Sequence, residues 1–294
     1  MLPHELSAGG IGAGGMRVRF RLMTIEDTPE AMQLKDAGGW NQTTADWARF
    51  LSASPEGCFV AEREGHVVGT STSIVYEGRF AWIGMVIVDS QYRGQGIGTA
   101  LLERAIRYLD SRKVPCMKLD ATPQGKPLYE KLGFASEYDI ERWMLMRQRG
   151  ANFAGKTSAE IEDVLRLDRE IFGADRSGLL RSLTEAAPDL TLVARQEPGI
   201  SGYAFGRRGS RADHLGPWMA RNEDVASTLL DEFLHRSSRE LVFVDCLRQN
   251  PWAIPLLRPR GFEFSRPLTR MFRGTNQYPG RPELLCAVLG PEFG

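Results

Sequence analysis

Residues 93–98 of this 294-residue sequence read Arg-Gly-Gln-Gly-Ile-Gly, and these residue types suit the binding of phosphate. Glycines at every second position carry no Cβ, so backbone N–H groups can approach a ligand closely. An apolar stretch at residues 85–88 precedes the loop, and an amphipathic pattern from Thr99 predicts a helix after it. The first amides of a helix lack internal partners and lie at the positive end of its dipole. Together with Arg93, they predict a site for a diphosphate group.

Two well-known phosphate motifs do not fit this loop. The P-loop requires Gly-Lys-Ser/Thr after a four-residue gap, and no Gly-Lys pair occurs in residues 93–104. The dinucleotide fingerprint places its third glycine three residues after the second, whereas only Ile97 separates Gly96 from Gly98. A tight strand-to-helix turn without a ligand remains the alternative interpretation.

The spacing of Arg93, Gly96 and Gly98 resembles the pyrophosphate loop Arg/Gln-x-x-Gly-x-Gly/Ala of the GNAT N-acetyltransferases, which bind acetyl-coenzyme A. Residues 127–134, Pro-Leu-Tyr-Glu-Lys-Leu-Gly-Phe, predict a helix that ends at Gly133, with Phe134 entering a strand. They are similar to a second GNAT segment, whose tyrosine lies by the coenzyme A sulfur. The resemblance covers residues 17–147. Within this range, residues 134–138 and 142–146 are expected to form the two strands of a hairpin. The resemblance implies the α/β (α+β) GNAT fold, in which a mixed, mainly antiparallel sheet is flanked by helices.

The resemblance also implies how acetyl-CoA would be held. A bulge at residues 85–88 is expected to splay two neighbouring strands, so that the pantetheine arm pairs there as an added strand would. Thr122 stands where many family members have an asparagine that contacts the cofactor. The cofactor-binding residues implied in this way are Val86, Ile87, Val88, Arg93, Gly94, Gln95, Gly96, Ile97, Gly98, Thr99, Thr122 and Tyr129.

Acetyl transfer to an amine also needs an acid and a base, and the sequence offers a candidate for each. Tyr129 is the candidate general acid, because a phenol with an ordinary pKa of about 10 stays protonated at neutral pH and can donate to a thiolate. Asp120, at the end of the expected fifth strand, is the candidate general base, since residues 80–88 carry no acid where many relatives have a glutamate. Packing of Tyr129 against the sheet and a turn role for Asp120 remain the alternatives.

In GNAT folds the early helical pair and its loop form one wall of the acceptor site. The resemblance therefore implies that Trp40 and Asn41 bind the substrate, and that Trp47 on the following helix lines the same pocket. Ordinary packing of both tryptophans is the alternative.

From residue 153 the sequence repeats itself. Phe134 and Arg142 in the first half are answered, at the same spacing, by Phe262 and Arg270 in the second. A strand expected at residues 153–158 would open the new copy. We therefore predict two GNAT folds in tandem, with a flexible tail at residues 1–15, a catalytic domain at 16–149 and a second domain at 150–294.

The second copy has lost the residues expected to do chemistry. Residues 219–224, Met-Ala-Arg-Asn-Glu-Asp, stand in place of the glycine loop, and their two acids would repel phosphate. Leu257 stands in place of Tyr129. We expect a degenerate copy with a structural or acceptor-shaping role.

Composition excludes several classes of protein. The sequence has 37 Lys+Arg and 37 Asp+Glu, without the basic excess expected of a nucleic-acid binder. Its four cysteines and four histidines are scattered, which argues against a metal site and for a reducing compartment. No apolar run reaches 18 residues, so no membrane span is expected, and residues 1–15 do not read as a signal peptide. A cytoplasmic protein is expected.

The sequence thus predicts an N-acetyltransferase that moves an acetyl group from acetyl-CoA to a primary amine of a small molecule, directly through a tetrahedral intermediate. We expect a monomer or homodimer with no metal and no nucleic-acid or membrane partner. The alternative is a non-catalytic acyl-CoA-binding sensor or regulatory module.

Overall fold

The computed structural model describes residues 18–148 and 161–294. The tail predicted at residues 1–15 and the strand predicted at residues 153–158 lie outside these ranges. The helices and strands, in chain order, are β1 (Arg19–Leu22), α1 (Thr28–Ala37), α2 (Thr44–Ala53), β2 (Phe59–Arg63), β3 (His66–Tyr76), β4 (Phe80–Val88), α3 (Ile97–Ser111), β5 (Cys116–Ala121), α4 (Lys126–Lys131), β6 (Ala135–Met146), α5 (Glu162–Phe172), α6 (Ser177–Ala186), β7 (Leu192–Gln196), β8 (Gly199–Arg208), β9 (Asp213–Ala220), α7 (Glu223–Arg236), β10 (Leu241–Leu247), α8 (Ala253–Leu257), β11 (Glu263–Gly274) and β12 (Leu285–Ala287).

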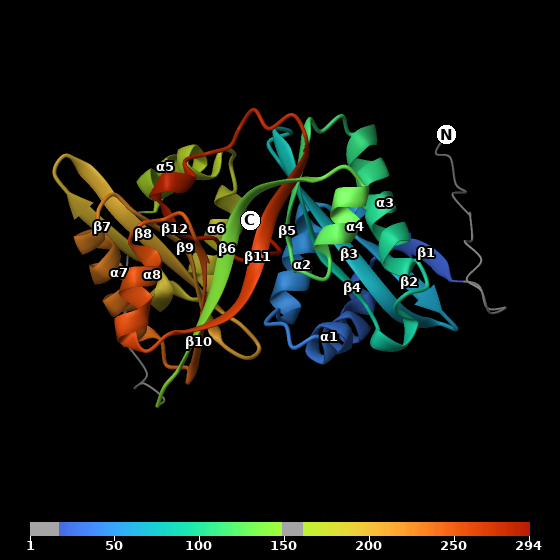
Figure 1. The fold of residues 1–294 in the computed structure, drawn as a ribbon, viewed down its shortest axis with the longest axis horizontal. Coiled ribbons are helices and arrows are strands. Elements are labelled where there is room, and N and C mark those ends of the chain that lie inside the picture. The colour runs from blue at the N-terminus through green and yellow to red at the C-terminus, as the bar shows by residue number, and fades with distance from the viewer. Residues whose placement is uncertain (1–17, 149–160) are drawn as a thin grey trace. The chain divides into compact units, whose positions relative to one another are not determined.

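Two copies of one element order make up the described chain. The series from α1 to β6 is two helices, three strands, a helix, a strand, a helix and a strand, and the series from α5 to β11 repeats it. We call these the first and second repeats. β1 precedes the first repeat and β12 follows the second, so the tandem α/β architecture predicted from the sequence is confirmed (Figure 1).

By compactness the chain forms two units, which do not coincide with the repeats. The first unit contains the chain up to Ile74 together with Ile83–Lys113. The second unit contains Val75–Trp82 and Val114–Gly294. The domain boundary predicted between residues 149 and 150 stays a prediction.

The first unit is a sheet in the order β1-β2-β3-β4 with helices packed on it. Helix α3 contacts this sheet through Ile97 and Leu101, which form a buried cluster with Val18, Ala61 and Val68. The apolar positions recur on one side of α3, as an amphipathic helix requires. This packing fixes the start of α3 at the end of β4.

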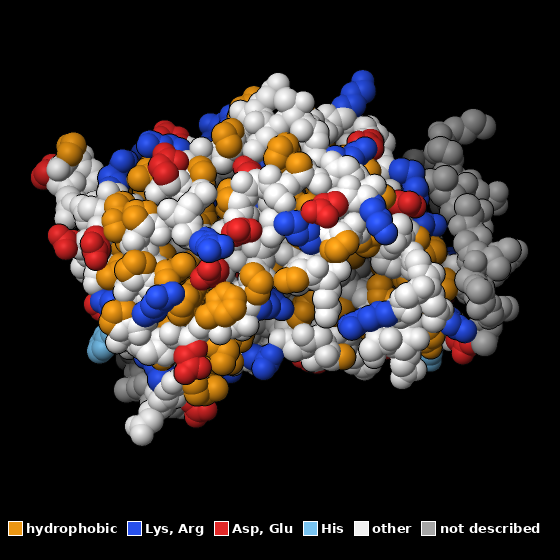
Figure 2. Space-filling model, in the orientation of Figure 1, with side chains coloured by type: hydrophobic (Ala, Val, Ile, Leu, Met, Phe, Trp, Pro, Cys, Tyr) orange, Lys and Arg blue, Asp and Glu red, His pale blue; other side chains and the backbone are white. Residues whose placement is uncertain are grey.

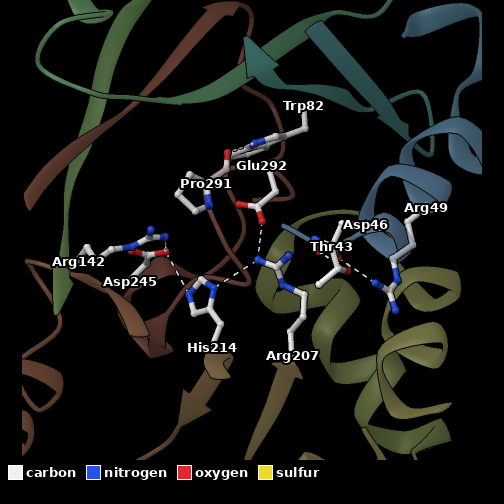
Figure 3. Close-up of polar contacts among 10 residues, drawn as sticks. All are labelled: Thr43, Asp46, Arg49, Trp82, Arg142, Arg207, His214, Asp245, Pro291 and Glu292. Carbon is white, nitrogen blue, oxygen red and sulfur yellow. Dashed lines mark hydrogen bonds and ion pairs between the residues drawn. The ribbon is translucent and has the colours of Figure 1, made fainter. Parts of the chain in front are cut away.

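Helix α2 of the first unit is set by its start and by its buried face. Thr43 is the N-cap, and the carboxylate of Asp46 accepts from the backbone N–H of Thr43 (2.8 Å) and from Arg49 (2.8 Å). This arrangement satisfies amides that the helix start leaves open (Figure 3). Trp47 and Phe50 are fully buried and anchor the helix in the core.

In the second unit the strand order is β5-β11-β6-β10-β12-β9-β8-β7, with the beginning of β4 beside β5. Figure 1 shows β6 and β11 side by side as two long strands, each of 12 residues. β11 pairs with β5 on its other edge, and β6 pairs with β10. The last strand of each repeat therefore joins the sheet of the other repeat.

The strand pairing corrects one sequence expectation. Residues 134–138 and 142–146 were expected to form a hairpin, but residues 135–146 form the single strand β6. The polar residues between them stay in the ladder, since Asp139 faces Thr269 and Glu141 faces Cys246. Arg248 approaches both carboxylates at 3.8 and 3.7 Å, so their charges do not require a turn.

Two buried ion pairs join the exchanged strands. Arg142 on β6 donates two hydrogen bonds of 2.7 Å to Asp245 on β10. Arg270 on β11 donates two hydrogen bonds of 2.9 Å to Asp120 on β5. The two arginines are the pair that repeats in the sequence. Each one therefore bonds an aspartate of the other repeat, and Figure 3 shows the pair of Arg142 and Asp245.

The surface mixes charges of both signs. On the face drawn in Figure 2, Lys and Arg side chains alternate with Asp and Glu, without a continuous field of one sign. None of the helices within residues 18–148 and 161–294 has both the length and the apolarity needed to cross a membrane.

Candidate functional site

The predicted glycine loop connects β4 to α3 within the first unit. Asp89 begins it by accepting a hydrogen bond of 2.8 Å from the N–H of Gln91. Gly94 and Gly96 have φ angles of 75° and 80°, which L side chains rarely adopt. A Cβ on either glycine would meet nothing within 4 Å. These two glycines therefore give the loop its shape and leave the surface above its backbone open.

The loop also leaves a row of backbone N–H groups open. Helix α3 starts after Gly96, which offers no side-chain cap, and its first turn contains no acid. The first bond of the helix runs from the N–H of Ala100 to the carbonyl of Gly96 (3.0 Å). Among the described residues, no acceptor takes the N–H groups of residues 94–99. Open amides at the positive end of a helix dipole are what an anion site requires, and the anion site itself stays a prediction.

Two side chains border these amides. Arg93 is exposed, and its Nε donates to the carbonyl of Val88 at 3.1 Å. Its two terminal nitrogens bond no described residue, so they remain available to a ligand. Gln95 is exposed as well, and its Nε2 lies 3.4 Å from the carbonyl of Gln91. The buried Ile97 anchors the loop below them.

Strand β4 is irregular just before the loop. Met85 has a φ of 50°, an uncommon conformation for a residue with a side chain. The carbonyl of Met85 accepts a hydrogen bond of 2.7 Å from the hydroxyl of Thr70 on β3. A left-handed residue inside a strand is a feature of bulges, which re-aim the backbone that follows. The backbone so re-aimed is that of Val86, Ile87 and Val88.

The structure brings Trp40 next to β4. A Cβ placed on Gly38 would lie 3.1 Å from Cδ1 of Ile87 and 3.2 Å from Nε1 of Trp40, so both side chains contact this glycine. Trp40 is half-buried, and Asn41 is buried at 2% exposure. Trp47 is fully buried in the core. Trp40 thus lies beside the strand implied to hold the pantetheine arm, while Trp47 packs.

Sequence reasoning missed two polar residues of the first unit. Oε1 of Gln42 and Oγ1 of Thr72 are buried and have no hydrogen-bond partner in the described chain. A buried polar atom without a partner is costly, and an unseen ligand is one reason to keep it. The only sequence signal was the run Thr-Ser-Thr-Ser at residues 70–73, which is unusual in a fully buried strand.

Tyr129 belongs to the second unit, on helix α4. Its ring is half-buried, lies against Gly125 and meets Phe134 edge to face with ring centroids 6.1 Å apart. Burial raises the pKa of the phenol to about 12. The hydroxyl bonds none of the described residues. A protonated hydroxyl without a partner is what a proton donor requires.

Thr122 and Asp120, which precede α4 in the chain, are both hydrogen-bonded. The hydroxyl of Thr122 accepts the N–H of Gly125 at 3.3 Å, which holds the turn into α4. Asp120 is buried, with both carboxylate oxygens bonded to Arg270. Burial alone would lower the pKa of Arg270, but Asp120 and Tyr138 raise it above its usual range. The cofactor role of Thr122 and the base role of Asp120 stay predictions.

Comparison with known proteins identifies the family. The family described as "Acetyltransferase (GNAT) family" matches residues 22–134, and the one described as "Acetyltransferase (GNAT) domain" matches residues 164–287. An acetyltransferase of Sodalis glossinidius is 32% identical over 112 residues, which span 36% of this chain and 74% of that protein. The chain belongs to the GNAT acetyltransferase family. Its two matches confirm the tandem arrangement.

Longer relatives match the chain almost end to end. A holothin acyltransferase of Pseudoalteromonas sp. is 25% identical over 260 residues, which span 87% of each chain. A solved structure from Pyrococcus horikoshii, whose assignment as an acetyltransferase is provisional, covers 99% of this chain and is itself covered completely. Its TM-score is 0.80 at 24% identity, so it supports the fold alone.

The two GNAT repeats differ at the start of their long helices. Helix α3 begins at Gly96 without a side-chain cap, whereas Asn222 caps α7 by accepting the N–H of Val225 at 2.9 Å. The first turn of α7 also carries Glu223 and Asp224. An occupied amide and two carboxylates disfavour phosphate at α7. Of the two helices, α3 alone keeps the features of a diphosphate site.

GNAT acetyltransferases use acetyl-CoA, and the loop geometry fits this co-substrate. Residues 94–99 offer open amides, an uncovered surface at two glycines and the free end of Arg93. In the part of the chain that the structure describes, no three His, Cys, Asp or Glu residues are grouped so as to hold a metal ion.

Proposed function

We propose that this protein is an acetyl-CoA-dependent N-acetyltransferase whose one active site belongs to the first repeat and whose acceptor is a primary amine of a small molecule. The observation that carries the proposal is the row of open amides at residues 94–99. Acetyl-CoA supplies the acetyl group as a thioester. The steps below describe what this chain's own residues would do.

Binding would begin with the diphosphate. The amides of residues 94–99 would donate to its oxygens, and Arg93 would add a charge-assisted contact. The left-handed conformation of Met85 would turn the backbone of residues 86–88 toward the pantetheine arm, which would pair with it as an extra strand does. Thr99 and Thr122 would each contribute a hydroxyl group.

Tyr129 would then protonate the leaving sulfur. The amine nitrogen forms a bond to the acetyl carbon, the bond from that carbon to sulfur breaks, and sulfur takes the electron pair. The phenol of Tyr129 gives its proton to that sulfur, and the amine loses a proton to a base. Because the pKa of Tyr129 is raised to about 12, the phenol holds its proton at neutral pH.

Asp120 is the candidate base, and its hydrogen bonds bear on that role. Asp120 would act directly or through water, but both of its oxygens are held by Arg270. That contact argues for a positioning role instead. The variant Asp120→Asn separates the two roles. If Asp120 is the base, the variant lowers kcat and alters the acidic limb of the pH profile. If Asp120 only positions Arg270 and its strand, the variant lowers the melting temperature and leaves the pH profile unchanged.

The acceptor would bind along Trp40 and Asn41. Trp40 presents an apolar ring, and Trp40 and Ile87 both lie against Gly38. One relative is named as a holothin acyltransferase, so holothin is one acceptor to include in the test.

The proposal is tested by thiol release. Acetyl-CoA is incubated with the full chain and a panel of small primary amines, and free thiol and acetylated amine are measured together. We expect at least one amine to yield both products in equal amounts. If acetyl-CoA raises the melting temperature and no amine yields thiol, the sensor alternative replaces the enzyme.

A further inference from the structure

The second repeat contains its own version of the strand pair that would hold the cofactor. In the first repeat, the parallel strands β4 and β5 pair at only two positions, Ala81 with Met117 and Trp82 with Lys118. In the second repeat, the parallel strands β9 and β10 occupy the same places in the element order and pair at residues 213–215 with 242–244. Both pairs thus leave later residues of their strands unpaired with each other.

In the second repeat, the space between these strands is filled. Strand β12 pairs antiparallel with β9, where Leu285 faces Met219, and with β10, where Cys246 faces Ala287. The sheet order β10-β12-β9 records this insertion. Residues 285–289 are buried to between 0 and 4% exposure. The chain itself therefore provides a strand at this position.

The fit of this strand is close. A Cβ on Gly216 of β9 would lie 1.9 Å from the carbonyl oxygen of Val288, so no larger residue fits beside it. The N–H of Val288 donates to the carbonyl of Asp245 on β10 at 3.0 Å. Pro217, next to Gly216, has no N–H to leave unpaired where β9 parts from β10.

The residues after β12 hold it in place through buried polar contacts (Figure 3). Glu292 forms an ion pair with Arg207 on β8, and both side chains are 3% exposed. The indole of Trp82 donates to the carbonyl of Pro291 at 2.9 Å. The hydroxyl of Tyr76 donates to the carbonyl of Phe293 at 2.8 Å. The segment is therefore a fixed part of the core.

We propose that residues 285–289 are a built-in strand that takes, in the second repeat, the place where an acyl-CoA arm would pair in the first. Three features of the second repeat each disfavour an acyl-CoA. Strand β12 fills the space between β9 and β10, Asn222 caps the start of α7, and the first turn of α7 carries two acids. The chain therefore has one acyl-CoA site. Residues 285–294 occupy the corresponding place in the second repeat as a part of its core. The count of one rests on the proposed function of the first repeat.

Calorimetry of the full chain with CoA tests the count. One equivalent bound is expected, and two equivalents would overturn the inference. No binding would instead overturn the proposed function, and the exchange experiment that follows would still decide the inference.

Hydrogen exchange tests the built-in strand independently of any activity. We expect the amides of residues 285–289 to exchange as slowly as those of β9 and β10, and saturating CoA to leave their rates unchanged. Rapid exchange, or release of the segment when CoA is added, would overturn the inference.

A pair of glycine variants locates the fit. Gly216→Ala places its methyl group against Val288, whereas a Cβ at Gly199, on β8 of the same unit, meets nothing within 4 Å. We expect Gly216→Ala to speed exchange at residues 285–289 about tenfold or more, and Gly199→Ala to leave it unchanged. Equal exchange rates at residues 285–289 in both variants would contradict the close packing of Gly216 against Val288. If Gly216→Ala does not fold, the exchange rates of the wild type test the inference.

Discussion

At the scale of the residue, Tyr129 combines the properties that a proton donor needs. Its ring is held by Gly125 and Phe134, and its hydroxyl bonds none of the described residues. Burial raises its pKa, which makes the neutral phenol the stable form. Packing of the ring determines the position of the Tyr129 hydroxyl, and burial keeps that hydroxyl protonated.

Removing the hydroxyl of Tyr129 should therefore slow chemistry with little effect on binding. We expect Tyr129→Phe to lower kcat about 100-fold, within the range of general acid catalysis, while KM for acetyl-CoA changes little because the ring contact with Phe134 is retained. Steady-state kinetics with thiol detection measures both constants. An unchanged kcat would remove Tyr129 from the mechanism.

The raised pKa of Tyr129 predicts the alkaline side of the pH profile. The acid works only when protonated. Activity should therefore fall when the phenol ionises, as the pH rises through about 12 and not through 10. A pH–rate profile of kcat should show no alkaline limb from this group below about pH 11. A limb near 10 that disappears in Tyr129→Phe would contradict the shift.

At the scale of the element, the exchange of β6 and β11 is fixed by buried ion pairs. Arg142 and Asp245 join β6 to β10, and the fully buried His214 also lies 3.1 Å from Asp245. Burial alone would raise the pKa of Asp245, but Arg142 and His214 hold it well below its usual range. Buried pairs of this kind fix strand register more than they add stability.

Breaking one such pair should be costly. We expect Asp245→Asn to lower the free energy of unfolding by about 3–5 kcal/mol. The variant would leave the buried guanidinium of Arg142 without its negative partner and would remove the carboxylate that His214 contacts. Asp231→Asn is the matched control: Asp231 also bonds an arginine, Arg260, but its side chain is 57% exposed. The control should cost less than about 1 kcal/mol. Urea denaturation measures both, and equal losses would contradict the account.

How much could be predicted from the sequence depended on how local the cause was. The loop, the helix after it and the helix of Tyr129 follow from glycines and apolar spacing within a few residues, so they were predicted. The exchange of β6 and β11 depends on partners more than 100 residues away, such as Asp245 for Arg142. The polar residues near Asp139 suggested a turn because their partner, Arg248, could not be known. The unpartnered atoms of Gln42 and Thr72 exist only once the fold has buried them.

At the scale of the whole molecule, the two repeats need each other's strands. Without residues 150–294, β5 would lose its neighbour β11, and β6 would lose both β10 and β11. Exposed strand edges and unpaired buried arginines and aspartates are unfavourable. Within the second unit, the end of the first repeat and the second repeat therefore depend on each other.

A fragment of residues 16–149 should accordingly not fold as the full chain does. We expect it to show no cooperative thermal transition, or one at least about 10 °C lower, by circular dichroism. The full chain measured under the same conditions is the control. A fragment that melts at the temperature of the full chain would show that the exchanged strands are dispensable.

The central claim is that open amides at the start of α3 grip a diphosphate, and a pair of glycine variants tests it most directly. Gly96 and Gly65 have φ angles of 80° and 83°, both lie in the first unit, and a Cβ on either meets nothing within 4 Å. Alanine at either position therefore adds a similar backbone strain, of roughly 1–2 kcal/mol. Only at Gly96 would the new methyl group lie over the amides of residues 94–99.

Isothermal titration of CoA into the full chain and the two variants gives the decisive comparison. We expect the wild type and Gly65→Ala to bind with similar Kd, and Gly96→Ala to bind about tenfold or more weakly. Equal binding by all three proteins, or no binding by the wild type, would contradict the claim.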